Sequence, residues 1–81
     1  MRHATAETLQ TIEPLLHELR SVPGLVEKRP GIFYRKSKAF LHFHEDPTGL
    51  HADVRFADDF ERARVETNAE RKALMARIRA L

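Results

Sequence analysis

The sequence predicts an α+β fold, a two-layer sandwich in which helices near the two ends of the chain cover one face of a three- to four-stranded antiparallel meander sheet. Two patterns support this: apolar residues at helical spacing near both ends, and alternating apolar and polar residues between them, divided by turn signals. Strands joined by short turns are antiparallel, and two helices can cover one face of a small sheet. With 81 residues, 42% of them hydrophobic, the chain is expected to form a single domain over residues 1–81.

The first helix is expected over residues 6–20. Its apolar positions recur at helical spacing and are Leu9, Ile12, Leu16 and Leu19. Pro14 lacks an amide donor, so the helix either kinks there or restarts with Thr11 as N-cap and Pro14 in the new first turn. The residues S-V-P-G at 21–24 then end it with a turn.

The alternating region begins at Gly31. A polar turn around Lys36 and Ser37 divides the first two strands, and the run D-P-T-G at 46–49 is a second turn signal that precedes a third strand at 50–56. Residues 57–65 are harder to interpret: we expect Phe60 to anchor this segment in the core and residues 63–65 to form a short edge strand.

The last helix is expected to begin after Thr67. The residues T-N-A-E at 67–70 form a capping box, in which Thr67 and Glu70 would satisfy free amides of the first turn. The apolar stripe of this helix consists of Leu74, Met75, Ile78 and Leu81.

The register of the second hairpin follows from the side to which its residues point. A loop of four residues pairs Glu45 with Leu50, which keeps the apolar residues of both strands on one side. The same register sets three further pairs opposite one another: His44 with His51, His42 with Asp53, and Phe40 with Arg55. Across the first hairpin, we expect Phe33 opposite Phe40, and Tyr34 in the core.

This register predicts a binding face on the side of the sheet away from the helices. Exposed aromatic residues usually mark a contact surface, so we expect a protein partner or an identical subunit to bind there. The alternative is that the first helix or residues 22–26 wrap around the sheet and bury the aromatic pair. The face consists of Phe33, Phe40, His42, His44, His51, Asp53 and Arg55.

The histidines on this face suggest a second hypothesis, a divalent metal site. Opposed side chains in a sheet begin about 5 Å apart, so imidazoles and a carboxylate could converge on zinc or iron. The candidate ligands are His42, His44, His51 and Asp53. The alternative is an ordinary polar strand face with no cofactor, and no compact metal motif such as H-E-x-x-H occurs in the sequence.

A third hypothesis is single-stranded nucleic acid, bound by stacking on the aromatic pair and by the cations Arg35, Lys36 and Lys38 together with the basic last helix. The net charge of +2 is too small to argue for it, and nearby acids would repel phosphates. Catalysis is not expected, because no serine or threonine is placed to act as a nucleophile beside a His–Asp pair and the chain has no cysteine.

The stretch PGLVEKRPGIFYRKSKAFLHF, followed by HADVRF and a terminal ERKALMARI helix, resembles the small MmcQ/YjbR-like proteins. Pro23 and Gly24 lie near the P-G-x-x-E turn of that family, with Glu27 one place late, and residues 38–43 match its second strand. The resemblance implies a fold shared with frataxin-like domains, with an open sheet surface, and DNA binding has been suggested for some members of the family.

Frataxin-like domains bind iron through acidic residues of their first helix. Here Glu7, Glu13 and Glu18 are too sparse for that role, so the resemblance transfers no functional residue to this chain. The first ten residues lack the apolar segment of a secretory signal, and no apolar run approaches the length of about 20 residues that a membrane span needs. We therefore expect a cytoplasmic protein with no membrane contact.

Overall fold

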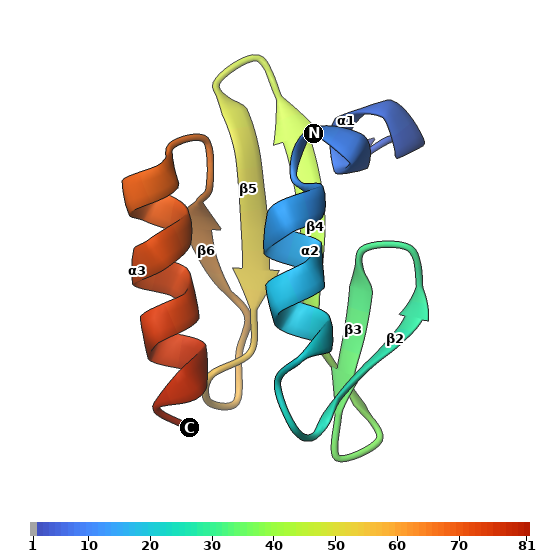
Figure 1. The fold of residues 1–81 in the computed structure, drawn as a ribbon, viewed down its shortest axis with the longest axis vertical. Coiled ribbons are helices and arrows are strands. Elements are labelled where there is room, and N and C mark those ends of the chain that lie inside the picture. Colours follow the sequence, from blue (N-terminus) through green and yellow to red (C-terminus); the bar gives the residue numbers. More distant parts are fainter. Residues whose placement is uncertain (1) are drawn as a thin grey trace.

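The computed structural model describes residues 2–81 and has an α+β architecture, as predicted (Figure 1). One antiparallel sheet has the strand order β2-β3-β4-β5-β6, and β1 also pairs with β4. Helices α2 and α3 cover the same face of this sheet, and we call the opposite side the uncovered face. The elements are β1 (Arg2–His3), α1 (Ala6–Thr11), α2 (Glu13–Arg20), β2 (Leu25–Arg29), β3 (Ile32–Arg35), β4 (Lys38–Asp46), β5 (Gly49–Val54), β6 (Glu61–Arg64) and α3 (Asn68–Arg79). No helix within residues 2–81 is long and apolar enough to cross a membrane.

The expected first helix is two helices. Pro14 lies in the first turn of α2, where an amide hydrogen is not needed, so the predicted restart is confirmed. The expected cap was wrong, because Ile12 occupies the N-cap position of α2 while the hydroxyl of Thr11 donates to the carbonyl oxygen of Thr8. Helix α1 has its own cap, since Thr5 accepts a hydrogen bond from the backbone amide of Thr8.

The sheet has six strands instead of three or four, because β1 and β2 were not expected. Neither strand carries a usable pattern: β1 has only two residues, and β2 reads L-V-E-K-R. The weak element at residues 63–65 is confirmed as a strand, β6, although it begins at Glu61. Pairing with neighbouring strands places these segments in the sheet where their own residues do not predict it.

The register predicted between β4 and β5 is confirmed. Glu45 lies opposite Leu50, and the pairs His44–His51 and His42–Asp53 follow. One further pair forms between Asp46 and Gly49, so the loop contains only two residues. Gly49 has φ +128, a conformation that glycine adopts without strain.

The register predicted between β3 and β4 was wrong. Phe33 lies opposite Leu41, while Tyr34 lies opposite Ala39, so β4 contains one extra residue, a β-bulge at Phe40. Because of the bulge, each side chain of β3 points to the opposite face of the sheet from the one expected. Tyr34 therefore leaves the predicted core position and is only half-buried.

Both aromatic residues of the expected binding face belong to the hydrophobic core. Phe33 is completely buried and Phe40 is 3% exposed, and both join the single cluster that lies between the sheet and the helices. The ring of Phe40 meets the edge of Phe56, with ring centres 6.1 Å apart. Because the bulge turns Phe40 inward, neither Phe33 nor Phe40 can form part of an exposed surface.

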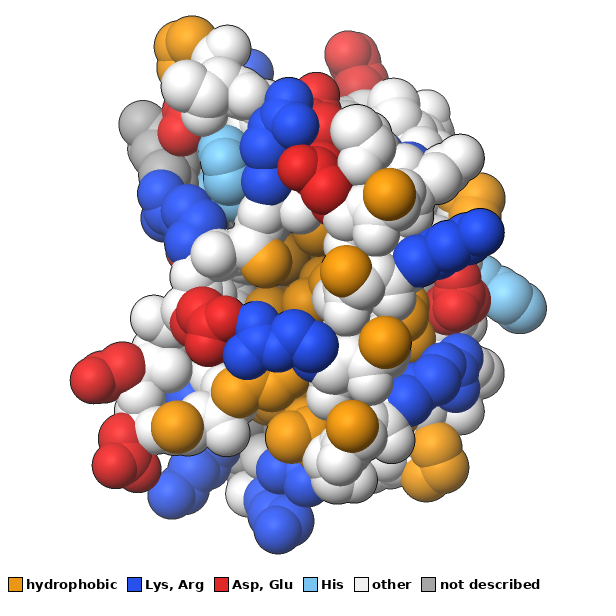
Figure 2. Space-filling model, turned by 90° about the vertical axis from the view of Figure 1, so that its left-hand side faces the viewer, with side chains coloured by type: hydrophobic (Ala, Val, Ile, Leu, Met, Phe, Trp, Pro, Cys, Tyr) orange, Lys and Arg blue, Asp and Glu red, His pale blue; other side chains and the backbone are white. Residues whose placement is uncertain are grey.

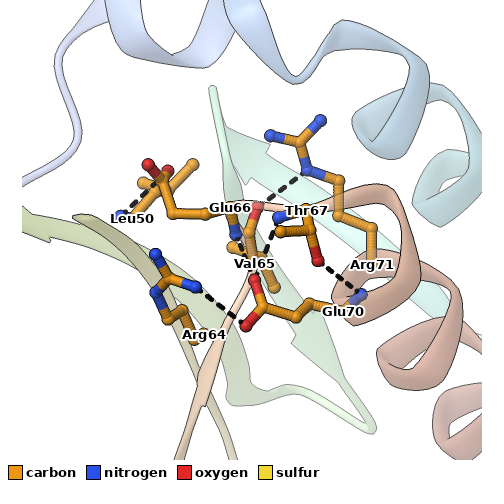
Figure 3. Close-up of polar contacts among 7 residues, drawn as sticks. All are labelled: Leu50, Arg64, Val65, Glu66, Thr67, Glu70 and Arg71. Carbon is orange, nitrogen blue, oxygen red and sulfur yellow. Dashed lines mark hydrogen bonds and ion pairs between the residues drawn. The ribbon is translucent and has the colours of Figure 1, made fainter. Parts of the chain in front are cut away.

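The predicted capping box at the start of α3 is present (Figure 3). Thr67 Oγ1 accepts from the amide of Glu70 at 3.1 Å, and Glu70 Oε1 accepts from the amide of Thr67 at 2.9 Å. Three contacts attach this turn to neighbouring segments: Arg71 donates to the carbonyl of Val65, Glu66 accepts from the amide of Leu50, and Arg64 of β6 donates to Glu70. The helix start is therefore attached to the first residues of β5.

Candidate metal centre on the uncovered face

Three histidines gather on the uncovered face of the sheet. His42 and His44 lie two residues apart in β4, and since side chains alternate along a strand, both point away from the buried Phe43. His3 is the second residue of β1 and lies directly opposite His44 in the β1–β4 ladder. Two neighbouring strands thus place three imidazoles together, and we call His3, His42 and His44 the histidine cluster.

The histidine cluster has distances close to those of a metal site. Ring centres are 4.5 Å apart for His3 and His44, 4.7 Å for His42 and His44, and 5.8 Å for His3 and His42. One candidate ligand nitrogen from each ring lies within 4.8 Å of the other two. Nitrogens bound tetrahedrally to zinc are about 3.3 Å apart, given a Zn–N bond of about 2.05 Å. Rotations that bring the nitrogens roughly 1 to 1.5 Å closer would complete the geometry.

The protonation state of His42 suits a metal ligand. Burial lowers the pKa of His42, and the positive charge that His44 can carry lowers it further. His42 is therefore mostly neutral at pH 7, and the neutral imidazole is the form that binds metals. Its Nδ1 is buried and makes no hydrogen bond within residues 2–81.

Asp53 lies beside the cluster, but its main hydrogen-bond partner is Arg62. Arg62 donates to both of its oxygens, through Nε at 2.9 Å and Nη2 at 3.1 Å, and these bonds lower the pKa of Asp53. Asp53 Oδ2 is also 2.9 Å from His44 Nδ1, within ion-pair distance but without the alignment of a hydrogen bond. Asp53 therefore contacts Arg62 and His44, and the group of described residues that could share one ion does not include it.

His51 is close to the cluster in the ladder but does not belong to it. It lies on β5, opposite His44 of β4 and opposite Arg64 of β6, and the described residues that could share one ion do not include it. The structure therefore assembles two of the four predicted ligands, His42 and His44, and adds His3. The sequence carries little signal for His3, because a two-residue strand has no periodicity.

Phe60 and Arg55 lie beside the cluster. We expected Phe60 in the core, but it is 40% exposed and its ring packs on His42, with centres 5.0 Å apart. The guanidinium of Arg55 lies 4.5 Å from the centre of the Phe60 ring. Strand β5 ends at Val54, and the loop that follows carries Phe60 to the uncovered face. Phe60 therefore lies between the Arg55 guanidinium and the cluster and covers part of the His42 ring.

The residues predicted to bind nucleic acid do not share one surface with the cluster. Arg35 lies over the ring of the buried Phe40, whereas Lys36 and Lys38 are exposed at the β3–β4 turn. On the side formed by α3 and β6, acidic and basic side chains lie next to one another (Figure 2). Arg77 of the basic helix pairs with Glu61. Such pairing offsets the positive charge that phosphates would need.

Comparison of the chain with family models, with curated proteins and with solved structures finds no match in any of the three. The resemblance to MmcQ/YjbR-like proteins therefore stays a prediction, and the chemistry of the histidine cluster is the basis on which function can be argued.

Proposed function

We propose that this chain is a divalent metal-binding domain whose metal is held by His3, His42 and His44. The observation that carries the proposal is the convergence of three imidazoles from two paired strands on one side of the sheet. Histidine has the side chain that most often binds metals in proteins, and a set of three imidazoles suits zinc, iron, copper or nickel. Of these we propose zinc or iron.

Three protein ligands leave a tetrahedral metal with one open position. Structural zinc sites usually have four protein ligands, whereas a site with three accepts water or an external group in the fourth position. The partial exposure of the cluster leaves room for such a group, since His42 and His44 are half-buried and His3 is exposed. We therefore propose a site that exchanges its fourth ligand with solvent, in a cytoplasmic domain.

Binding of a protein partner through the uncovered face was the first hypothesis from the sequence, and it loses its main support. It depended on Phe33 and Phe40, which are buried in the core. The residues that remain of that face are polar: His42, His44, His51, Asp53 and Arg55. Their chemistry favours an ion over an apolar contact, which is why the metal hypothesis is placed first.

The direct test is isothermal titration calorimetry with Zn²⁺ at pH 7, in a buffer that does not chelate metals. We expect one ion per chain, and a loss of at least about tenfold in affinity for each of His42→Ala and His44→Ala. His51→Ala is the matched control, because His51 lies on the same face outside the cluster and should leave the affinity unchanged.

Co²⁺ in place of Zn²⁺ adds a readout of coordination, since its visible absorption depends on the number and type of ligands. We expect the spectrum of the wild-type chain to change in His3→Ala and to be unchanged in His51→Ala. Failure of the wild-type chain to bind either ion, or an equal loss of affinity in His51→Ala, would refute the proposed function.

A further inference from the structure

Strand β1 is attached to the fold by few contacts. It has two residues, both exposed, and among residues 2–81 it pairs only with the end of β4 that carries His44 and Glu45. The next residue, Ala4, adds one more hydrogen bond to β4, from its amide to the carbonyl of Phe43 at 3.1 Å. Arg2 pairs with Glu45, but the side chain of Arg2 is 74% exposed, and ion pairs of that kind contribute little to stability.

The side chains of the two residues of β1 point to opposite sides of the sheet. His3 joins the histidine cluster on the uncovered face. Arg2 points to the other side, where it lines a cavity of about 570 Å³ together with Thr8, Glu45, Leu50 and Glu66. The same short strand is therefore part of the metal site and part of a cavity wall.

We propose that the metal fastens β1 to β4, so that binding at the histidine cluster fixes the wall of the cavity on the opposite side of the sheet. This inference rests on the proposed function. His42 and His44 come from one strand and remain close whether or not β1 is docked, whereas His3 reaches the metal only when β1 pairs with β4. The metal thus binds the docked state more tightly and shifts the population toward it.

The linkage also acts in reverse. Any molecule that occupies the cavity and contacts Arg2 in its docked position also favours the docked strand. By thermodynamic reciprocity, such a molecule and the metal raise one another's affinity by the same factor. The coupling depends on the backbone pairing of β1 with β4, which places His3 at the metal and Arg2 at the cavity. It requires no change in the other strands.

The size of the effect follows from mass action. Some amides exchange with water only when β1 separates from β4. If this separation abolished metal binding, free metal at about a hundred times its Kd would slow their exchange by about a hundredfold. Because His42 and His44 keep part of the affinity when β1 leaves, we expect a smaller protection, about tenfold or more. The effect should be confined to groups that β1 docking protects.

The experiment is amide–water exchange by NMR at pH 7, with and without saturating Zn²⁺. The main reporter is the amide of Ala4, which donates to Phe43, and the Nε–H of Arg2 reports on the cavity wall, since it donates to Glu45. The amide of Arg55, which donates to the carbonyl of Phe40, is the internal reference. We expect Zn²⁺ to slow exchange at Ala4 and Arg2 but not at Arg55.

Two variants complete the test. In His3→Ala, Zn²⁺ should still bind weakly but should no longer protect Ala4, whereas His51→Ala should behave like the wild-type chain. If calorimetry shows one bound Zn²⁺ and Ala4 exchanges at an unchanged rate, fastening of β1 is wrong while the proposed function stands. If no Zn²⁺ binds, both are wrong. Protection of Ala4 that persists in His3→Ala would also overturn the inference.

Discussion

Asp53 connects His44 to Arg62: its Oδ2 atom is 2.9 Å from Nδ1 of His44, and both of its oxygens accept hydrogen bonds from the arginine. Histidines that bind metals usually direct their other ring nitrogen at a carboxylate or a carbonyl, which fixes the tautomer and the ring orientation. In this arrangement the negative charge of Asp53 would favour the His44 tautomer with the proton on Nδ1 and leave Nε2 free for the metal.

Asp53→Asn tests this role. The amide keeps the shape of the side chain but loses the charge that orients His44, so we expect the affinity for Zn²⁺ to fall by about 10- to 100-fold. Calorimetry at pH 7 measures the change. Asp58→Asn, in an exposed loop, makes the same chemical change away from the cluster and should have no effect. Equal affinities in wild type and Asp53→Asn would show that Asp53 does not support the site.

Stability should decrease at mildly acidic pH because of His42. Its pKa in the folded chain lies below the ordinary value of 6.5, so the unfolded chain binds more protons as the pH falls below about 6.5. The contribution of neutral His42 is therefore present above pH 6.5 and is lost as the pH falls through the lower folded pKa. Urea unfolding of the metal-free chain between pH 7 and pH 5 measures this loss.

His42→Asn is the comparison for this pH dependence, because it removes the titrating ring. We expect the free energy of unfolding to fall less steeply with decreasing pH in the variant than in the wild type. The pKa of Asp53 is lowered from 3.8, so its own titration lies below this window and does not obscure the comparison. Equal slopes in the two proteins would contradict the assignment of the effect to His42.

Phe40→Ala should destabilise the fold strongly. Phe40 is 3% exposed and packs against Phe56, and replacing a buried phenylalanine with alanine typically costs about 3 to 5 kcal/mol. Phe60→Ala is the matched control, since Phe60 is 40% exposed and should cost much less. Urea unfolding of both variants gives the comparison. If the two costs were similar, the inward bulge at Phe40 would be wrong.

Thr67→Ala removes half of the capping box of α3. The amide of Glu70 loses its acceptor, and we expect a cost of about 1 kcal/mol in the free energy of unfolding. Thr67→Ser keeps the hydroxyl and should retain most of the stability. Urea midpoints of the two variants, compared with the wild type, measure the difference, and an equal loss in both would argue against a role for the hydroxyl.

The sequence was a good guide where geometry left few choices. In the β4–β5 hairpin, a short loop closed by Gly49 and the need to bury Phe43 and Ala52 together allowed one register, and it is the observed one. The start of the last helix was equally predictable, because the capping box is a local signal, but Leu81, expected on its apolar stripe, is 52% exposed and lies beyond the helix end. Each of these features depends on residues that are close in sequence.

The sequence was a poor guide where distant pairing decides the outcome. A bulge at Phe40 involves no glycine and leaves the alternation of apolar residues intact, so the sequence predicted burial of Phe33 and Phe40 only as the alternative to an exposed face. His3 joins the cluster only because β1 finds the free end of β4, a contact across about 40 positions of sequence. Two of the three histidines of the candidate site, His42 and His44, were therefore predicted from the sequence, and the third, His3, was not.

The bulge at Phe40 also makes the length of the β3–β4 turn independent of the register between β4 and β5. An unpaired residue in a ladder can absorb a change of one residue in length, since the pairing on either side of it is already out of step. Losing one residue near the β3–β4 turn would convert the bulge into regular ladder and leave His42 and His44 paired with β5 as before. The spacing from position 42 onward is therefore independent of the length of the β3–β4 turn, whereas the inward position of Phe40 depends on the bulge.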